Sequence, residues 1–318
     1  MTTLDFNQTV PRAMVHRASL CEVFLTSAVR VDADTFDVGS QVPRTHSLYG
    51  DRLSLPTHYD PVLYVEAARQ ACIYVAHEYF EAPQGNHFIL RDAEMEVVDH
   101  TGLAVLPVPT NSVLRCSVLR RFKNRESAVT GLRMLVTVLV NGEAAMTVQM
   151  SYSWVPAEKW QAMRAGNRAE LGLLFEPQAR PLPTRANPAT VDRLNPANVV
   201  ISPPRATTSG RTASLVVDTA HPALFDHPLD HVPGMLQLEA FRQLAITTAG
   251  FGRLTGMTAR FVGFAELDLP SECESAIVSA GDDVEVRCAV RQAGRTVAEA
   301  QVTLAMADRP TAARPVRG

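Results

Sequence analysis

The sequence predicts an α+β protein of two repeated modules, each with an antiparallel sheet wrapped around one long central helix. Three observations lead to this fold class. The two halves of the chain share sequence in three ordered blocks, which indicates duplication of one module. Each half contains one long stretch that is apolar on nearly every side, which is typical of a buried helix. Each stretch is followed by β-rich runs with turn residues between them, so the sheet has to surround the helix.

Length and composition agree with two globular modules. At about 150 residues per domain, the 318 residues correspond to two domains, and 46 % hydrophobic with 20 % charged residues is ordinary for such a protein. The 30 basic and 33 acidic residues give a net charge of −3 without a basic block, which argues against a nucleic-acid partner. No apolar run reaches the roughly 18 residues of a membrane span, and residues 1–5 lack a secretory signal. We expect a cytoplasmic protein that binds neither nucleic acid nor membrane.

The repeat is clearest around the two apolar stretches. Residues 63–71 and 236–244 share the pattern E-A-x-R-Q at an offset of 173. Upstream, Arg17 corresponds to Arg193 at an offset of 176, so the loop between these blocks differs by three residues. Similarity in ordered blocks predicts that the two halves adopt the same fold.

The repeat also sets the expected boundaries. We place the first module over residues 10–165 and the second over 189–308, with a proline-containing linker over 166–188 between them. Residues 309–318 hold two prolines, three arginines and no apolar cluster, and we expect a disordered tail there.

The central helices are expected over residues 61–79 and 233–251. Asp60 before Pro61 suits an N-cap followed by proline at the first helical position, where the missing N–H costs nothing. Pro233 and Gly234 open the second helix in a similar way. Both helices are apolar nearly all round, so we expect them to be buried on most faces.

Strands are expected after each helix. In the first module they cover 112–119, 128–140 and 144–154, and in the second 283–291 and 296–305, with tight turns at Asn141–Gly142 and Ala293–Gly294. A short helical patch over 157–164 follows the first module.

The E-A-x-R-Q pattern supplies the first candidate site residues. Glu66 with Arg69, and Glu239 with Arg242, are spaced i, i+3 and share a helix face. On a solvated helix such pairs are ordinary salt bridges, but burying a carboxylate and a guanidinium costs several kcal/mol per ion unless they are well paired. We therefore favour a functional role for these residues. Gln70 and Gln243, at i+4, either orient the carboxylates or satisfy backbone groups, and the sequence leaves both readings open.

The loop before the second helix is rich in histidine and carboxylate. It holds His227 and His231, but its prolines prevent a regular helix and no metal-ligand spacing is present, so we expect no metal. One of these histidines is a candidate for acid–base work, the alternative being a hydrogen-bonded strut of the loop. Gly234 opens a helix whose free N–H groups suit a ligand oxygen, the alternative being that Pro233 and Gly234 only start the helix.

The first module offers a weaker counterpart. Arg44 and His46 precede its helix and are candidate substrate-binding residues, again with a structural alternative. The remaining histidines follow no pattern, and we treat them as structural: His16, His77, His87 and His100.

The segment 225–240, FDHPLDHVPGMLQLEA, resembles the signature of hotdog-fold acyl-carrier-protein dehydratases, which carry His, a Pro-Gly pair and then Glu in the central helix. In those enzymes the catalytic His lies nine residues before the Gly, and Phe225 occupies that place here, which argues against dehydration. With the paired E-A-x-R-Q helices, the chain over roughly 300 residues is similar to the A-factor biosynthesis (AfsA-type) family of tandem hotdog proteins.

This resemblance implies a double hotdog fold and synthesis of γ-butyrolactone, butenolide or related furan signals. The implied reaction transfers a β-ketoacyl group from acyl carrier protein to the hydroxyl group of dihydroxyacetone phosphate, without a metal or redox cofactor.

Within this reaction, Glu239 or Glu66 is the candidate proton acceptor. Arg242, with Arg69 as the second candidate, is expected to hold either the phosphate or the β-keto oxygen. Two other interpretations stay open: a hotdog thioesterase or dehydratase, and a non-catalytic module that binds an acyl ligand.

Overall fold

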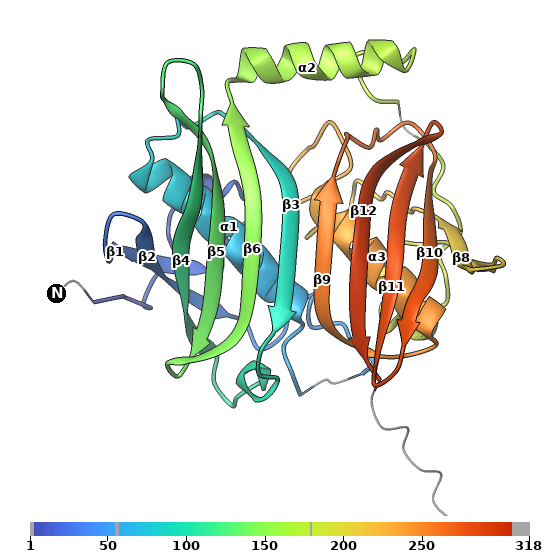
Figure 1. Ribbon diagram of the computed structural model, residues 1–318, viewed down its shortest axis with the longest axis horizontal. Helices are drawn as coiled ribbons and strands as arrows, with labels where there is room; N and C mark the ends of the chain where they lie inside the picture. The colour runs from blue at the N-terminus through green and yellow to red at the C-terminus, as the bar shows by residue number, and fades with distance from the viewer. Residues whose placement is uncertain (1–2, 55–56, 179, 307–318) are drawn as a thin grey trace, which may run out of the picture.

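The computed structural model describes residues 3–54, 57–178 and 180–306, and the expected tail at 309–318 lies outside them. All twelve described strands form one antiparallel sheet in the order β1-β2-β4-β5-β6-β3-β9-β12-β11-β10-β8-β7 (Figure 1). Their bounds are β1 Leu25–Arg30, β2 Thr35–Val42, β3 His87–Val97, β4 Thr110–Lys123, β5 Val129–Val140, β6 Glu143–Val155, β7 Arg205–Ala206, β8 Gly210–Ser214, β9 Arg253–Phe261, β10 Ser271–Ala280, β11 Asp283–Gln292 and β12 Arg295–Ala305.

Each half of the sheet curves around one helix, as expected. Helix α1 covers Pro61–Tyr79, and the Asp60 carboxylate caps it by accepting the Val62 N–H at 3.0 Å. Helix α3 covers Gly234–Ala249 and ends two residues earlier than predicted, because Gly250 takes the left-handed conformation that terminates a helix (φ 86°). Both helices are buried along most of their length, since the sheet leaves them little contact with water (Figure 1).

The two halves meet at the centre of the sheet. Strands β3 and β9 pair antiparallel from Asp92 with Arg260 to Glu96 with Gly256. Because β3 and β9 each directly follow the central helix of their repeat, this pair lies on the internal two-fold relation between the repeats (Figure 1). Any site between α1 and α3 therefore draws residues from both halves.

Helix α2, Ala157–Glu170, runs across the end of the sheet between the halves (Figure 1). It is six residues longer than the predicted patch and extends into the segment predicted as linker. Its second half is held by Arg164 and Arg168, one turn apart, which both bind the buried carboxylate of Glu266. This tie attaches a helix that follows the first repeat to the second repeat.

Short 3-10 turns precede the first strands of each repeat and show the duplication in detail. Turn η1, Arg12–Val15, ends at His16, and turn η4, Pro188–Val191, ends at Asp192. Both end residues have left-handed backbone conformations, with φ of 53° and 58°. Turns η2, Leu20–Glu22, and η5, Pro196–Asn198, follow at the same spacing, and η3 covers Thr101–Leu103.

Among the described residues, no helix is long and apolar enough to cross a membrane.

Candidate functional site

The carboxylate of Glu66 is the centre of a buried cluster on α1. Arg69 donates to it through Nε and Nη2, both at 2.8 Å, which is the bidentate geometry of a strong ion pair. Arg17, from the loop after η1, donates through Nε at 3.2 Å, and Gln70 donates through Nε2 at 2.8 Å. The Glu66 side chain is fully buried and is compensated by two guanidinium groups.

The second repeat builds the same cluster on α3. Arg242 donates to Glu239 through Nε at 3.0 Å and Nη2 at 2.9 Å, and Arg193 donates through Nε at 3.0 Å. Gln243 completes the set through its Nε2. The sequence correspondence of Arg17 with Arg193 thus reflects a shared structural role.

The two glutamines both orient the carboxylates and satisfy the backbone. Gln70 accepts the Phe24 N–H at 3.0 Å and donates to the Glu22 carbonyl at 2.7 Å. In the second repeat, Gln243 bonds Val200 N–H and the Asn198 carbonyl in the same way. Each glutamine therefore fixes the segment before the first strands of its repeat to the central helix.

Both carboxylates are held in the charged form. Burial raises the pKa of Glu66, but Arg17 and Arg69 outweigh it and bring the pKa to about 2. Arg193 and Arg242 likewise overcome burial and bring the pKa of Glu239 to about 2. A carboxylate whose lone pairs already accept from two guanidiniums and an amide is a weak proton acceptor at neutral pH. The geometry favours an anchoring role for both.

The cluster on α3 is sealed. Arg242 is 1 % exposed, and its Nη1 lies 3.5 Å from Asp60 and 4.0 Å from Asp192 in addition to the Glu239 pair. Asp192 in turn accepts from Arg52 Nε at 3.1 Å. All these charges are compensated within the protein, which leaves this arginine no free edge toward a ligand.

The cluster on α1 is open by comparison. The Arg69 side chain is 22 % exposed, and its only acceptor within the described residues is Glu66. His227 lies in the loop before α3 with its side chain 37 % exposed, and its Nδ1 is 3.5 Å from the Asp226 carboxylate. That carboxylate accepts the N–H groups of Ala18 and Ser19, which follow Arg17 in the first repeat. A loop of the second repeat thereby borders the cluster of the first.

The two helix starts also differ. At α1, Pro61 has no N–H and the Val62 N–H is capped by Asp60. At α3, no hydrogen bond from Gly234 N–H or Met235 N–H to the described residues is present, and no side chain caps them. A Cβ atom on Gly234 would lie 3.3 Å from the Phe261 ring, so glycine permits the close packing of this helix start on β9.

Strand β3 brings the α3 start near the α1 cluster. A Cβ on Gly234 would lie 3.6 Å from Leu90, while Phe88, two residues earlier on β3, packs edge-on against His16 at 5.0 Å between ring centroids. Side chains two residues apart on a strand lie on the same face, about 7 Å apart. The α3 start with its free N–H groups thus packs on Leu90, and His16 packs on Phe88, the neighbouring side chain on the same face of β3.

The other predicted site residues lie elsewhere. His231 bonds Asp230 at 2.6 Å and packs on Trp160 and Phe264 under α2, and no hydrogen bond joins it to either Glu–Arg cluster within the described segments. His46 accepts the Leu48 and Tyr49 N–H groups through Nδ1, which makes it a strut of its loop.

Arg44 is exposed and lies with His46 at a small polar pocket before α1. That pocket is lined by Pro43, Arg44, His46, Tyr49, Gly50, Arg52, His58, Tyr59, Leu63 and Val105.

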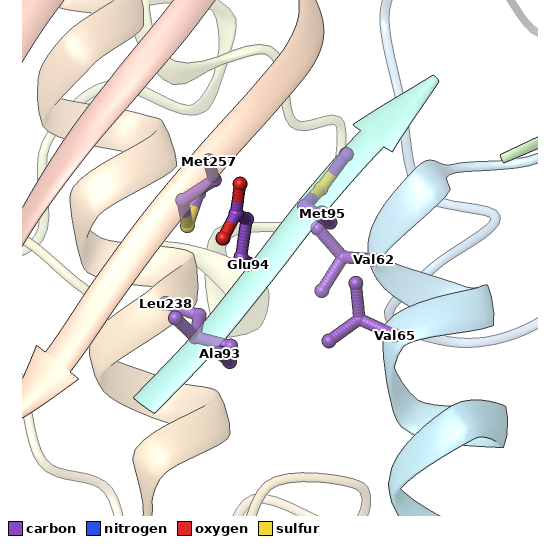
Figure 2. Close-up of a pocket in the computed structure, with 7 residues that line it drawn as sticks. All are labelled: Val62, Val65, Ala93, Glu94, Met95, Leu238 and Met257. Atoms are coloured by element: carbon purple, nitrogen blue, oxygen red, sulfur yellow. The ribbon is translucent and has the colours of Figure 1, made fainter. Parts of the chain in front are cut away.

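An apolar pocket lies between the two central helices. Figure 2 shows Val62 and Val65 on α1 and Leu238 on α3, with strand β3 passing between them in this view. Ala93, Glu94 and Met95 of β3 and Met257 of β9 complete its lining. The pocket is small and lies on the line where the two repeats meet. In the described part of the chain, no three His, Cys, Asp or Glu side chains are grouped to hold a metal ion.

Sequence reasoning did not assign roles to Arg17, Arg193, Asp226 or His16. The repeat offset was the available signal for the arginines, because both stand at equivalent places before the first strands. The run of histidines and carboxylates before α3 drew attention to Asp226, but it gave no signal of the bonds that Asp226 makes to backbone groups 207 and 208 residues away.

The fold and the paired clusters define a tandem hotdog protein in which one of two equivalent sites is open. The chain belongs to the A-factor biosynthesis hotdog domain family, whose model matches residues 2–156 and 175–308. The predicted family is thereby confirmed.

Two curated relatives cover most of the chain, and both are named 2-oxo-3-(phosphooxy)propyl 3-oxoalkanoate synthase. The Streptomyces virginiae protein is 34 % identical over 91 % of this chain and 95 % of its own length. The Streptomyces coelicolor protein is 31 % identical over 84 % of this chain and 82 % of its own length.

Solved structures confirm the predicted fold. A putative oleoyl thioesterase from Lactobacillus plantarum has a TM-score of 0.54 at 10 % identity, covering 88 % of this chain and 99 % of its own. The 12:0-ACP thioesterase from Umbellularia californica has a TM-score of 0.52 at 9 % identity, covering 87 % and 100 %. At this identity the likeness concerns the fold alone.

Proposed function

We propose that this protein transfers a 3-oxoacyl group from the thioester of an acyl carrier protein to the hydroxyl group of dihydroxyacetone phosphate. The product is the 2-oxo-3-(phosphooxy)propyl 3-oxoalkanoate named in both relatives, a precursor of a γ-butyrolactone-type signal. We propose that this reaction takes place in the cytoplasm. The observation that carries the proposal is the single open cluster, where a partly exposed arginine and a histidine border the same buried carboxylate site and free helix N–H groups lie nearby across β3.

We assign the reaction to the α1 cluster rather than the α3 cluster. A transfer to a phosphate-bearing acceptor needs a cation with a free edge, a proton acceptor and oxyanion donors. Arg69, His227 and the α3 start supply these three groups. At the equivalent places of the other cluster stand the sealed Arg242, the cation Arg52 and a capped proline start.

The groups have distinct roles in this assignment. His227 takes the proton of the acceptor hydroxyl, and the oxygen attacks the thioester carbonyl, whose oxyanion the Gly234 and Met235 N–H groups receive. The C–S bond then breaks and the proton passes from His227 to the leaving thiolate. Arg69 holds the phosphate through its guanidinium, and Glu66 and Gln70 hold that arginine in place. The apolar pocket between the helices receives the first carbons of the acyl chain.

The remaining candidates support the site from outside. Arg242 joins the repeats through Asp60, and Glu239 and Gln243 complete the buried polar cluster around it. His231 holds the loop before α3 under helix α2. His46 holds the loop before α1 by accepting the Leu48 and Tyr49 N–H groups. Arg44, exposed at the polar pocket, offers a further positive charge for binding the acyl carrier protein that donates the acyl group.

The test is to incubate the protein with a 3-oxoacyl-carrier thioester, with and without dihydroxyacetone phosphate, and to weigh the products. We expect the phosphorylated ester only when the acceptor is present. Free 3-oxo acid at equal rates in both samples would identify a thioesterase, an enoyl thioester a dehydratase, and absence of turnover an acyl-binding protein.

A further inference from the structure

The internal repeat places two histidines where the sealed site has a salt bridge. Asp192 corresponds to His16, since both end a 3-10 turn in the left-handed conformation and lie 176 residues apart. Arg52 corresponds to His227 at an offset of 175. The same offset relates Asp51 to Asp226, and these two carboxylates make equivalent bonds to the opposite repeat. The Arg52–Asp192 pair, bonded at 3.1 Å, therefore maps onto His227 and His16.

The hydrogen bonds of His77 determine which ring nitrogen of His16 carries a proton. His77 Nδ1 lies 2.7 Å from the Ala82 carbonyl, which only accepts, so this nitrogen carries hydrogen. In a neutral ring the other nitrogen, Nε2, is then an acceptor. It lies 2.9 Å from His16 Nε2, which therefore donates. The Nδ1 of a neutral His16 is left with a lone pair and with no partner within the described residues.

His227 lacks a strong acceptor of its own. Its neighbour Asp226 is 3.5 Å away and already accepts two backbone N–H groups. An imidazole that takes a proton becomes a cation with two donors, one of which has to be received by the protein. At the sealed α3 cluster the corresponding cation, Arg52 of the first repeat, gives its Nε–H to Asp192.

We propose that His16 and His77 are positioning residues for His227, with His16 Nδ1 accepting a ring N–H of His227 in the substrate-bound enzyme. This inference rests on the proposed function. It leaves the second nitrogen of His227 as the acceptor of the hydroxyl proton. The chain then runs from the Ala82 carbonyl through His77 and His16 to His227, and every proton that His227 takes leaves on the thiolate.

The charges around His16 keep this lone pair available. The His16 ring faces His77 and Arg69 from α1, His87 from β3 and His227 from the loop before α3. Burial, followed by the charges of His77, Arg69 and His227, lowers the pKa of His16 to about 3. The His16 ring is therefore neutral at neutral pH, and its Nδ1 lone pair is free to accept a hydrogen bond.

The test uses two substitutions that suit the left-handed backbone of residue 16. Glycine and aspartate both tolerate positive φ, so His16→Gly removes the ring and His16→Asp installs the acceptor found at position 192, each without backbone strain. We expect kcat to fall by about two orders of magnitude in His16→Gly, the low end of what a positioned base contributes. We expect His16→Asp to recover most of that loss.

The pH profile separates positioning from a structural role. A carboxylate beside an imidazolium favours the charged form, so His16→Asp should move the acidic limb of the kcat/KM profile upward by about one pH unit or more. Thermal unfolding of both variants is the control for folding. An acidic limb that stays in place, or equal activity of the glycine variant and the wild type, would overturn the proposal.

A measurement without turnover distinguishes this inference from the proposed function. Nitrogen-15 NMR of histidine-labelled protein reports which ring nitrogen carries the proton. We expect Nδ1–H for His77 and Nε2–H for His16, and the opposite tautomer at His16 would refute the relay whatever the enzyme makes. If the tautomers are as expected and no phosphorylated ester forms, the proposed function fails and the proposed role in that reaction falls with it.

Discussion

Replacing Arg69 and Arg242 in turn should separate the open cluster from the sealed one. In Arg69→Ala the lost contact is a charge-assisted bond to the acceptor's phosphate, worth about 1.5–3 kcal/mol. At about 1.4 kcal/mol for each factor of ten, the apparent KM for dihydroxyacetone phosphate should rise roughly 10- to 100-fold. Glu66 keeps Arg17 and Gln70 as partners, so the fold should lose little stability.

Arg242→Ala should have the opposite signature. It leaves Glu239 with one guanidinium and takes the nearest cation from Asp60, whose buried Oδ2 has no hydrogen-bond partner in the described residues. Removing one member of a buried ion network costs about 3–5 kcal/mol. At roughly 2–4 °C for each kcal/mol, the melting temperature should fall by about 10 °C, with KM for the acceptor nearly unchanged in the folded fraction.

The assay varies dihydroxyacetone phosphate at a fixed 3-oxoacyl thioester concentration and records thermal unfolding of each variant. Lysine is the matched control at both positions, since it keeps the charge and loses the bidentate fork, and we expect it to recover part of each loss. A larger rise in KM for Arg242→Ala than for Arg69→Ala would refute the assignment of the reaction to α1.

Three further predictions follow from single contacts. The pKa of Glu66 and Glu239 is lowered in the folded state from the ordinary 4.5 to about 2, so their ion pairs stabilise the fold above pH 4.5. This stability should be lost as pH falls toward 2, which denaturant unfolding at several pH values checks. Gly234→Ala should lower kcat about tenfold by displacing the helix start from Phe261, seen as a kcat loss with stability changed by less than about 1 kcal/mol. Arg164→Ala should destabilise the protein by about 3–5 kcal/mol, because the buried Glu266 loses a bidentate partner.

The sequence was sufficient for the parts of the fold that depend on local pattern. The i, i+3 and i+4 spacing puts Glu66, Arg69 and Gln70 on one turn of a helix whatever surrounds it. Asp60 and Pro61 mark the start of α1 through backbone chemistry that is equally local. Family resemblance and the internal repeat then supplied the hotdog fold around these helices.

The difference between the open cluster and the sealed cluster depends on contacts between residues that are distant in sequence. Sequence reasoning left Glu66 as one of two candidate proton acceptors. The contact that favours an anchoring role instead is the second guanidinium, which comes from Arg17, 49 residues away. His16 carried no motif, and its relation to His77 comes from a contact across 61 residues. The repeat offsets contained part of this information, because His16 and Asp192 are equivalent, but they do not say which residues meet across the two-fold relation.

Separating the repeats should abolish folding of both halves, because each holds the other's loops. Asp226 accepts the N–H groups of Ala18 and Ser19, and Asp51 accepts those of Leu194 and Asn195. Keeping the halves apart would deprive both carboxylates and these four N–H groups of their partners in the other repeat. It would also expose the paired edges of β3 and β9, which are templates for aggregation.

We therefore expect residues 1–165 and 185–318 to be insoluble when expressed apart and to regain a folded complex when expressed together, measured by size-exclusion chromatography and circular dichroism. Two soluble, folded monomers would show that the bonds of Asp226 and Asp51 to the opposite repeat contribute little to stability. The sealed cluster would then lose its structural purpose, since a repeat that folds alone does not need Arg52 of its partner to compensate Asp192. The asymmetry between the sites is thus tied to the stability of the pair.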